Sequence, residues 1–249
     1  MKKIIILMLS AVCLAGASAQ ERNGESRDML ALGGGVMLRQ DPYIGSEIET
    51  DPIPFINFVE GNLYVYGPVF GYRLYECPDW IFDAAGQFRF PVHNGSKDIL
   101  LDGMNERHAT VDLGARLTRR LEWFDLKLGV LADVLNNHKG YEINLEASKR
   151  YNFEWLNLTP ALGALYHDDN FNEFYYGVRP AEARPTRSVY YSGDAVNWYA
   201  QLMANFMITE NWTFTASVRY EWLPDEVTNS PIVGRDYQVS TIAGVYYKF

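Results

Sequence analysis

Apolar and polar residues alternate along much of the chain, and residues 212–222 show this pattern most completely. A period of two is typical of a β-strand with one apolar face. A tryptophan closes each end of this apolar face, and about eleven residues is the length that a lipid-facing barrel strand needs. The apolar face carries Trp212, Phe214, Ala216, Val218, Tyr220 and Trp222, and the polar face carries Thr213, Thr215, Ser217, Arg219 and Glu221.

The same alternation predicts strands throughout the chain, and most are longer than the usual five or six residues. A soluble β-sandwich or a lipocalin-like barrel is the rival fold, but it explains neither the strand length nor the aromatic residues at strand ends. The sequence therefore predicts an all-β protein, a transmembrane antiparallel up-and-down β-barrel. Besides 212–222, the predicted strands are 29–39, 52–59, 63–75, 80–92, 111–118, 124–134, 141–150, 156–166, 198–208 and 236–249.

These segments make eleven strands, whereas bacterial outer-membrane barrels have an even number. Pro52 and Pro54 cannot both donate to a ladder, so 52–59 is predicted to be irregular or edge-like. The barrel then has 10–12 strands: ten if 52–59 is not a full strand, and twelve if one more strand is present. Long loops at 94–108, 167–196 and 223–235 are predicted outside the cell, and short turns near 121–123, 152–153 and 209–211 face the periplasm.

The last segment, 236–249, ends on Phe249 with Tyr247 two residues before it. This ending resembles the C-terminal signal of outer-membrane barrels, so we expect the barrel assembly machinery to recognise Phe249. Ile242 and Tyr246 are exceptions, because they fall among the polar residues of the inward face.

Residues 1–19 have the basic start, short apolar core and small residues before Gln20 that are typical of a secretory signal peptide. Residues 20–28 form a polar segment, and 29–249 form the predicted barrel. Cys13 lies inside the apolar core without the small residue before it that a lipoprotein signal has, and Cys77 is the only cysteine left after cleavage. The net charge of −9 argues against a nucleic-acid partner. The predicted location is the outer membrane of a Gram-negative bacterium, in contact with lipid and lipopolysaccharide.

The candidate catalytic residues are few. His167, Asp168 and Asp169 resemble part of the His/Asp set of barrel proteases, but a solvated loop start is the simpler interpretation. Ser217 has no histidine partner visible in the sequence, and no metal-ligand spacing is present. We therefore predict no catalytic, cofactor or metal residues. The predicted inward charges either line a pore or pair with one another and plug it, and pairing is favoured in a narrow barrel; they are Arg89, Asp112, Arg116, Lys127, Asp133, Glu142, Glu146, Arg150, Arg219 and Glu221.

Four loop and strand motifs follow one another in a recognisable order: Tyr43-Ile44-Gly45-Ser46 with Pro52-Ile53-Pro54, Tyr175-Tyr176-Gly177-Val178, Asn229-Ser230-Pro231-Ile232-Val233, and Tyr247-Lys248-Phe249. Together they resemble the MipA/OmpV family of outer-membrane proteins over nearly the whole mature chain. The resemblance implies a non-enzymatic barrel that joins a lytic murein transglycosylase to a penicillin-binding protein as a scaffold. It also implies structural roles for the motifs, with Gly45 and Gly177 in turns of unusual φ.

Two other functions stay open at this stage. The inward polar residues favour a small passive channel. The loop 167–196 favours a surface adhesin or stress-response barrel, because it carries several aromatic residues: Phe171, Phe174, Tyr175, Tyr190 and Tyr191.

Overall fold

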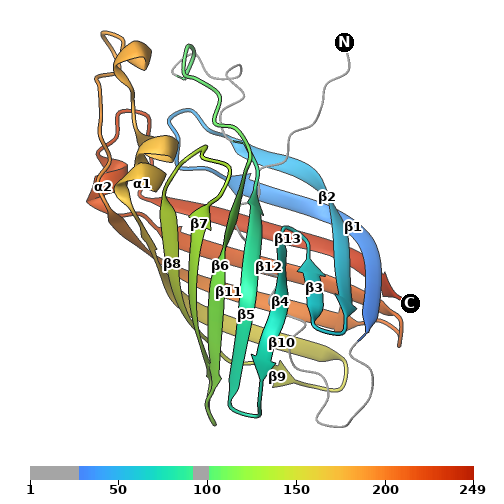
Figure 1. Cartoon of the computed structure of the whole chain (residues 1–249). Coiled ribbons are helices and arrows are strands. Elements are labelled where there is room, and N and C mark those ends of the chain that lie inside the picture. Colours follow the sequence, from blue (N-terminus) through green and yellow to red (C-terminus); the bar gives the residue numbers. More distant parts are fainter. Residues whose placement is uncertain (1–27, 92–100) are drawn as a thin grey trace.

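The computed structural model describes residues 28–91 and 101–249, so the predicted signal peptide, nearly all of segment 20–28 and part of loop 94–108 lie outside the described residues (Figure 1). Strands account for most of the described chain. They are β1 (Met29–Gln40), β2 (Ile48–Glu60), β3 (Leu63–Tyr66), β4 (Val69–Glu76), β5 (Trp80–Arg89), β6 (Thr110–Arg120), β7 (Asp125–Asp133), β8 (Tyr141–Ser148), β9 (Tyr151–Asn152), β10 (Leu156–His167), β11 (Ala195–Met207), β12 (Trp212–Trp222) and β13 (Tyr237–Lys248).

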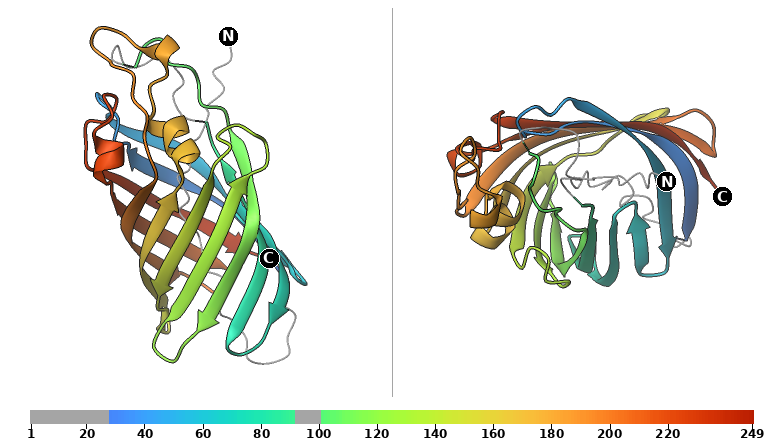
Figure 2. Two further views of the ribbon diagram at one scale, coloured as in Figure 1. Left: turned by 60° about the vertical axis from the view of Figure 1, so that its left-hand side comes forward. Right: turned by 90° about the horizontal axis from the view of Figure 1, so that it is seen from above.

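The strands pair antiparallel with their neighbours, and the pairing of β10 with β11 closes the sheet into a ring (Figure 2). β8 and β9 both pair with β10 and form one interrupted strand. The interruption at Lys149 lies beside Pro160, whose nitrogen has no hydrogen to donate to the ladder. The structure is thus a closed antiparallel barrel of twelve strands, which confirms the predicted fold class and selects the upper strand number.

The twelfth strand comes from the segment predicted as one strand at 63–75. Gly67, with a φ of 56°, and Pro68 turn the chain there, so the segment divides into β3 and β4. The proline-bearing segment is a full strand, β2, which pairs with β1 along 48–59 and with β3 only along 57–60. Within the described residues, 48–56 therefore have a ladder on one side, and that arrangement tolerates Pro52 and Pro54.

The two faces of the strands differ as the alternation predicts. Val218 on β12 is 42% exposed on the outside, whereas the adjacent Ser217 is 4% exposed and faces the lumen. Ile242 packs inside the barrel in an apolar cluster with Met37 and Phe55, and Tyr246 packs against this cluster. The two exceptions to the alternation in β13 are therefore lumen residues.

One end of the barrel carries larger loops and all the helical segments (Figures 1 and 2). These segments are α1 (Asp169–Tyr176), η1 (Pro180–Glu182) and α2 (Asp225–Thr228), none of which the alternation predicted. We call this end the outer end. The antiparallel order places residues 28 and 249 at the opposite end, together with the short turns. Among the helices of the described residues, none has the length and apolarity to cross a bilayer.

Candidate functional site

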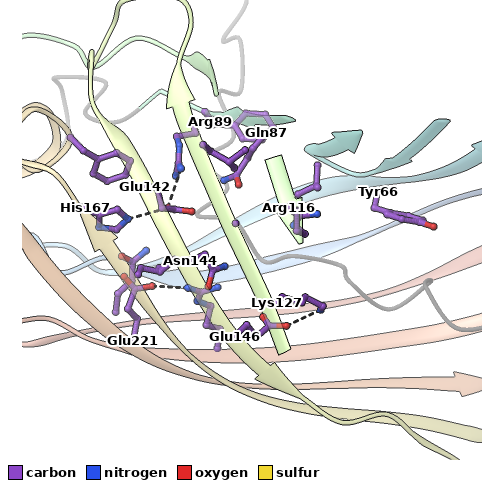
Figure 3. Close-up of a pocket in the computed structure, with 18 of the residues that line it drawn as sticks. Tyr66, Gln87, Arg89, Arg116, Lys127, Glu142, Asn144, Glu146, His167 and Glu221 are labelled. Atoms are coloured by element: carbon purple, nitrogen blue, oxygen red, sulfur yellow. Dashed lines mark hydrogen bonds and ion pairs between the residues drawn. The ribbon is translucent and has the colours of Figure 1, made fainter. Parts of the chain in front are cut away.

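A chain of charged side chains runs along one wall of the lumen in its outer half. Arg89 of β5 pairs with Asp112 of β6, and its Nη2 lies 3.1 Å from Glu142 Oε2 of β8. His167 Nε2 of β10 lies 3.0 Å from the same Glu142 oxygen (Figure 3). His138 Nε2 lies 2.9 Å from Asp112 Oδ1. The five residues come from four strands and one loop of one continuous part of the sheet, from β5 to β10.

Helix α1 covers this network from the outer end. Asp168 caps the helix by accepting a hydrogen bond from the backbone N–H of Phe171, and it also accepts one from the N–H of Tyr141 on β8. The cap directs the Phe171 ring onto His167, with the ring centroids 4.0 Å apart and the planes 6° from parallel. The Arg89 guanidinium carbon lies 4.9 Å from the same ring. An aromatic ring from the loop thus packs against the lumen charges.

A second network lies among β7, β8, β11 and β12. Lys127 Nζ is 2.8 Å from Glu146 Oε1, and the Tyr199 hydroxyl donates to Glu146 Oε2 at 2.9 Å. The Arg219 guanidinium carbon lies 3.7 Å from the centroid of the Tyr199 ring. Gly163 of β10 makes room for this ring, because a Cβ at Gly163 would overlap it. Arg89, Lys127 and Arg219 therefore each pair with a carboxylate, as predicted.

The pairing leaves a cavity of about 180 Å³ in the lumen beneath α1. Its walls combine the charged networks with aromatic rings, as the side chains in Figure 3 illustrate. The lumen is therefore lined by ion pairs but is not completely filled by side chains.

The loop motifs of the sequence meet in a buried cluster at the outer end, which we call the outer cap. Tyr43 bonds through its hydroxyl to the backbone oxygen of Tyr175 at 3.2 Å, and Ser230 Oγ donates to the backbone oxygen of Tyr176 at 2.6 Å. Burial raises the pKa of the Tyr175 and Tyr176 phenols, which therefore stay neutral. The buried residues of the outer cap are Tyr43, Met104, Tyr176, Val178, Ala195, Leu223, Val227, Ile232 and Val233.

The two motif glycines have different roles. Gly45 has a φ of 76°, which confirms the predicted turn of unusual φ. Gly177 has a φ of −75°, so the same prediction is wrong for this residue. A Cβ there would lie 2.5 Å from the backbone oxygen of Glu173, so the end of α1 needs glycine for space and not for φ.

A buried ion pair fastens the outer cap. Arg107 is 1% exposed and forms two hydrogen bonds to Glu182, at 2.9 and 3.2 Å. Burial alone would raise the pKa of the Glu182 carboxyl. The hydrogen bonds from Arg107 and from the backbone N–H groups of Arg179 and Asn105 outweigh burial and lower that pKa to about 2. The loop before β6 is thereby joined to the loop that carries α1 and η1.

The candidate catalytic set does not assemble as a set. His167 pairs with Glu142 on the neighbouring strand β8, while Asp168 caps α1 and Asp169 lies in its first turn. Ser217 Oγ has no hydrogen-bond partner among the described residues. Each of these acidic residues therefore has a structural position, and the prediction of no catalytic residues stays a prediction.

The spacing of residues in the sequence did not reveal one group of possible metal ligands. Ligand atoms of Asp112, Asp133 and His138 lie within 4.8 Å of one another, although two of the residues are on different strands. Asp133 accepts hydrogen bonds from Thr110 and from three backbone N–H groups of the loop that follows it. Asp112 already binds Arg89 and His138. These bonds give each carboxylate a structural partner.

The aromatic residues of the loop 167–196 do not form one exposed surface. Phe171 and Phe174 are buried against the lumen and the cap, and Tyr190 is half-buried. Tyr191 is exposed. The observation that motivated an adhesin therefore has a structural explanation in the packing of α1.

Comparison with known proteins gives consistent matches. Residues 32–249 match the family model described as MltA-interacting protein MipA. The chain is 28% identical over 254 residues to the MltA-interacting protein of Escherichia coli, with 100% of each chain covered. It is 29% identical over 147 residues to the outer membrane protein OmpV of Vibrio cholerae, covering 59% of this chain and 57% of that one. A solved outer membrane channel from Pseudomonas putida matches with a TM-score of 0.49 and 11% identity, covering 93% and 98% of the two chains.

Proposed function

Because the chain belongs to the MltA-interacting protein (MipA) family, we propose that it docks a murein-remodelling enzyme at its periplasmic end. The barrel itself lies in the outer membrane of a Gram-negative bacterium. The observation that carries the proposal is the similarity, over the full length of both chains, to a protein named for its interaction with MltA. The family resemblance implies a lytic murein transglycosylase and a penicillin-binding protein as the partners.

The geometry supports an interaction role over a passive channel. The outer cap lies over one end of the barrel, and ion pairs between strands of its wall line the lumen below it. A solute that crosses the barrel would have to pass the outer cap and then the charged side chains that line the lumen. A protein that binds at the periplasmic end does not have to pass the outer cap or the charged lumen.

Two neighbouring periplasmic turns form a surface suited to a protein partner. Trp123 at the tip of the β6–β7 turn is 75% exposed, and Phe153 and Trp155 of the next turn are exposed as well. Lys149 Nζ donates to the backbone oxygen of Glu122 at 3.1 Å and joins the two turns. We call this surface the turn face; it comprises Glu122, Trp123, Lys149, Phe153, Glu154 and Trp155. Aromatic rings are enriched where proteins bind one another.

The competing explanation is that these rings lie among lipid headgroups, where tryptophan and tyrosine are also enriched. Photocrosslinking in living cells distinguishes the two. A crosslinkable amino acid is placed at Glu122 or Glu154 on the turn face, and at Tyr191 on the outer loops as the matched exposed control. The crosslinked proteins are then identified by mass spectrometry.

We expect a lytic transglycosylase or a penicillin-binding protein from positions 122 and 154, and neither from position 191. Recovery of only the assembly machinery and lipopolysaccharide from all three positions would contradict the docking proposal. Crosslinks to lipid alone at 122 and 154 would favour the headgroup explanation.

Two further contacts belong to the same proposal. The outward apolar faces of the strands would contact lipid and lipopolysaccharide. Phe249 is exposed, and its backbone N–H donates to the oxygen of Leu30 at 2.9 Å, so its ring is available to the barrel assembly machinery at the end of the last strand.

A further inference from the structure

Four neighbouring turns of the periplasmic end share one pattern, in which an acidic residue lies one or two positions before a tryptophan. The turns join β4 to β5, β6 to β7, β9 to β10 and β11 to β12, so they follow one another around the rim of the barrel. Only 31 of the 249 residues are acidic, so composition alone does not explain the repeat. The four pairs are Asp79 with Trp80, Glu122 with Trp123, Glu154 with Trp155, and Glu210 with Trp212.

The tryptophans indicate where these turns lie relative to the membrane. Trp80 and Trp212 begin their strands on the outward face, and the Trp155 ring stacks on Phe206 with the ring centroids 6.0 Å apart. Tryptophan is enriched at the level of the lipid headgroups, and aromatic girdles flank the apolar band of an outer-membrane barrel. Each acidic residue lies in the turn itself, so its carboxylate is exposed to the periplasm.

The barrel leaves most of this negative charge unbalanced. Asp79 has a partner, since its Oδ2 lies 3.4 Å from Arg119 Nη1. Lys149 is close to the next turn, but it donates to a backbone oxygen and not to the carboxylate. The side chains of the other three turns are exposed and form no ion pair or hydrogen bond among the described residues; they are Glu122, Glu154 and Glu210.

The spacing of the four carboxylates matches the surface of a protein. Adjacent strands lie about 4.8 Å apart, and neighbouring turns are two strands apart, so successive turns are separated by roughly 10 Å along the rim. Four turns therefore extend over about 30 Å, a width that suits a standard protein interface of about 800 Å² per partner. A small ligand would reach only one or two of the turns.

We propose that these four turns dock a protein that presents a basic surface. We call the four carboxylates the acidic rim; they belong to Asp79, Glu122, Glu154 and Glu210. Opposite charge on a partner speeds the encounter and determines the orientation of the complex, and like charge repels wrong partners. Trp123 and Phe153 supply apolar contact between the carboxylates. The acidic rim extends the turn face to two further turns, so its role rests on the docking function proposed above.

Photocrosslinking in living cells tests the charge. A photocrosslinkable phenylalanine derivative replaces Phe153, which is 54% exposed beside Glu154. The crosslinked proteins are compared among the natural barrel, a neutral-rim barrel and a control barrel. The neutral rim carries Glu122→Gln, Glu154→Gln and Glu210→Gln. The control removes the same number of charges from exposed residues of the outer loops and carries Glu47→Gln, Glu106→Gln and Asp236→Asn. Heat-modifiable mobility on gels verifies that each barrel is folded.

We expect a protein to be crosslinked through the natural rim, with lysine and arginine enriched in its crosslinked peptide. An exposed ion pair contributes a factor of about 1.5 to 5 to an equilibrium. Loss of three such pairs in the neutral rim should therefore lower the crosslink yield about 3- to 100-fold. The control barrel should keep the natural yield, because its substitutions lie at the opposite end.

Two results would overturn the acidic rim and leave the docking function intact: recovery of a murein enzyme in equal yield from the natural and neutral rims, or equal losses in the neutral rim and the control barrel. A protein without murein activity that is lost only from the neutral rim, and that is crosslinked through a basic peptide, would support the acidic rim and contradict the proposed murein partner. Absence of any crosslinked protein would overturn both.

Discussion

The ion pair between Arg107 and Glu182 determines how firmly the outer cap is held. Glu182→Gln removes the carboxylate and leaves the Arg107 guanidinium buried without a counter-charge. Removal of one partner from a buried pair costs about 3–5 kcal/mol. Since 1.4 kcal/mol is a factor of ten, the opening equilibrium of the cap should rise at least about 100-fold. The strands keep their ladders, so the barrel should stay closed.

Hydrogen exchange of the α1 amides measures cap opening, and heat-modifiable mobility on gels reports the barrel. The matched control is Asp102→Asn, because Asp102 pairs with Arg184 at 3.2 Å on the surface, where both side chains are well exposed. A surface pair contributes at most about 1 kcal/mol, so exchange should change less than tenfold. Equal exchange in the two variants would refute the reasoning.

The same residue predicts a pH dependence. The pKa of Glu182 in the folded cap is about 2, below the ordinary value of about 4.3 for a glutamate. A lowered pKa stabilises the cap above the ordinary value, and this stabilisation is lost as the pH falls toward 2. The difference in α1 exchange between the natural chain and Glu182→Gln should therefore be full at pH 5 and shrink toward pH 2. A constant difference over this range would contradict the assignment of the charge to Glu182.

Three other substitutions test the barrel itself. Leu128→Arg should lower the yield of assembled barrel, because arginine facing lipid costs about 2–4 kcal/mol at the bilayer midplane, whereas Lys127→Arg on the lumen face should have little effect; equal yields would reverse the assignment of faces. Gly163→Val should lower the thermal stability by about 1–3 kcal/mol through overlap with the Tyr199 ring, and Tyr199→Ala should restore part of it in the double variant; no loss in the single variant would show that the ring is free to move. Phe249→Ala should slow assembly in cells without changing the stability of the folded barrel, and an unchanged assembly rate in pulse-chase would remove Phe249 as a signal.

The strands were predictable because their alternation is a local property. Successive side chains of a strand point to opposite faces of the sheet. The apolar face of 212–222 can therefore be recognised without knowledge of any partner strand. The division of 63–75 was not visible in this way, because the turn at Gly67 and Pro68 keeps the alternation nearly continuous on both sides. Gly followed by Pro is a turn signal, and it was the only local evidence for the twelfth strand.

Helix α1 was also missed, although the sequence contains a signal for it. Asp168 is a good N-cap, and Phe171 and Phe174 recur with the spacing of one helical turn. The segment is only eight residues long, so its helical period is short compared with the strand pattern around it. The helix is stabilised by packing on His167 and on the outer cap, and this packing forms only in the folded barrel.

Local sequence patterns could not predict which inward charges pair with one another, for a different reason. The sequence gives the sign and direction of each inward charge, but the choice of partner depends on the stagger between strands, which barrel closure fixes. Arg89 of β5 pairs with Glu142 of β8, although β6 and β7 lie between these strands. His167 of β10, the next strand after β8 in the sheet, pairs with the same carboxylate. The lumen networks therefore depend on how several strands are staggered, whereas the turn face depends on two adjacent hairpins only.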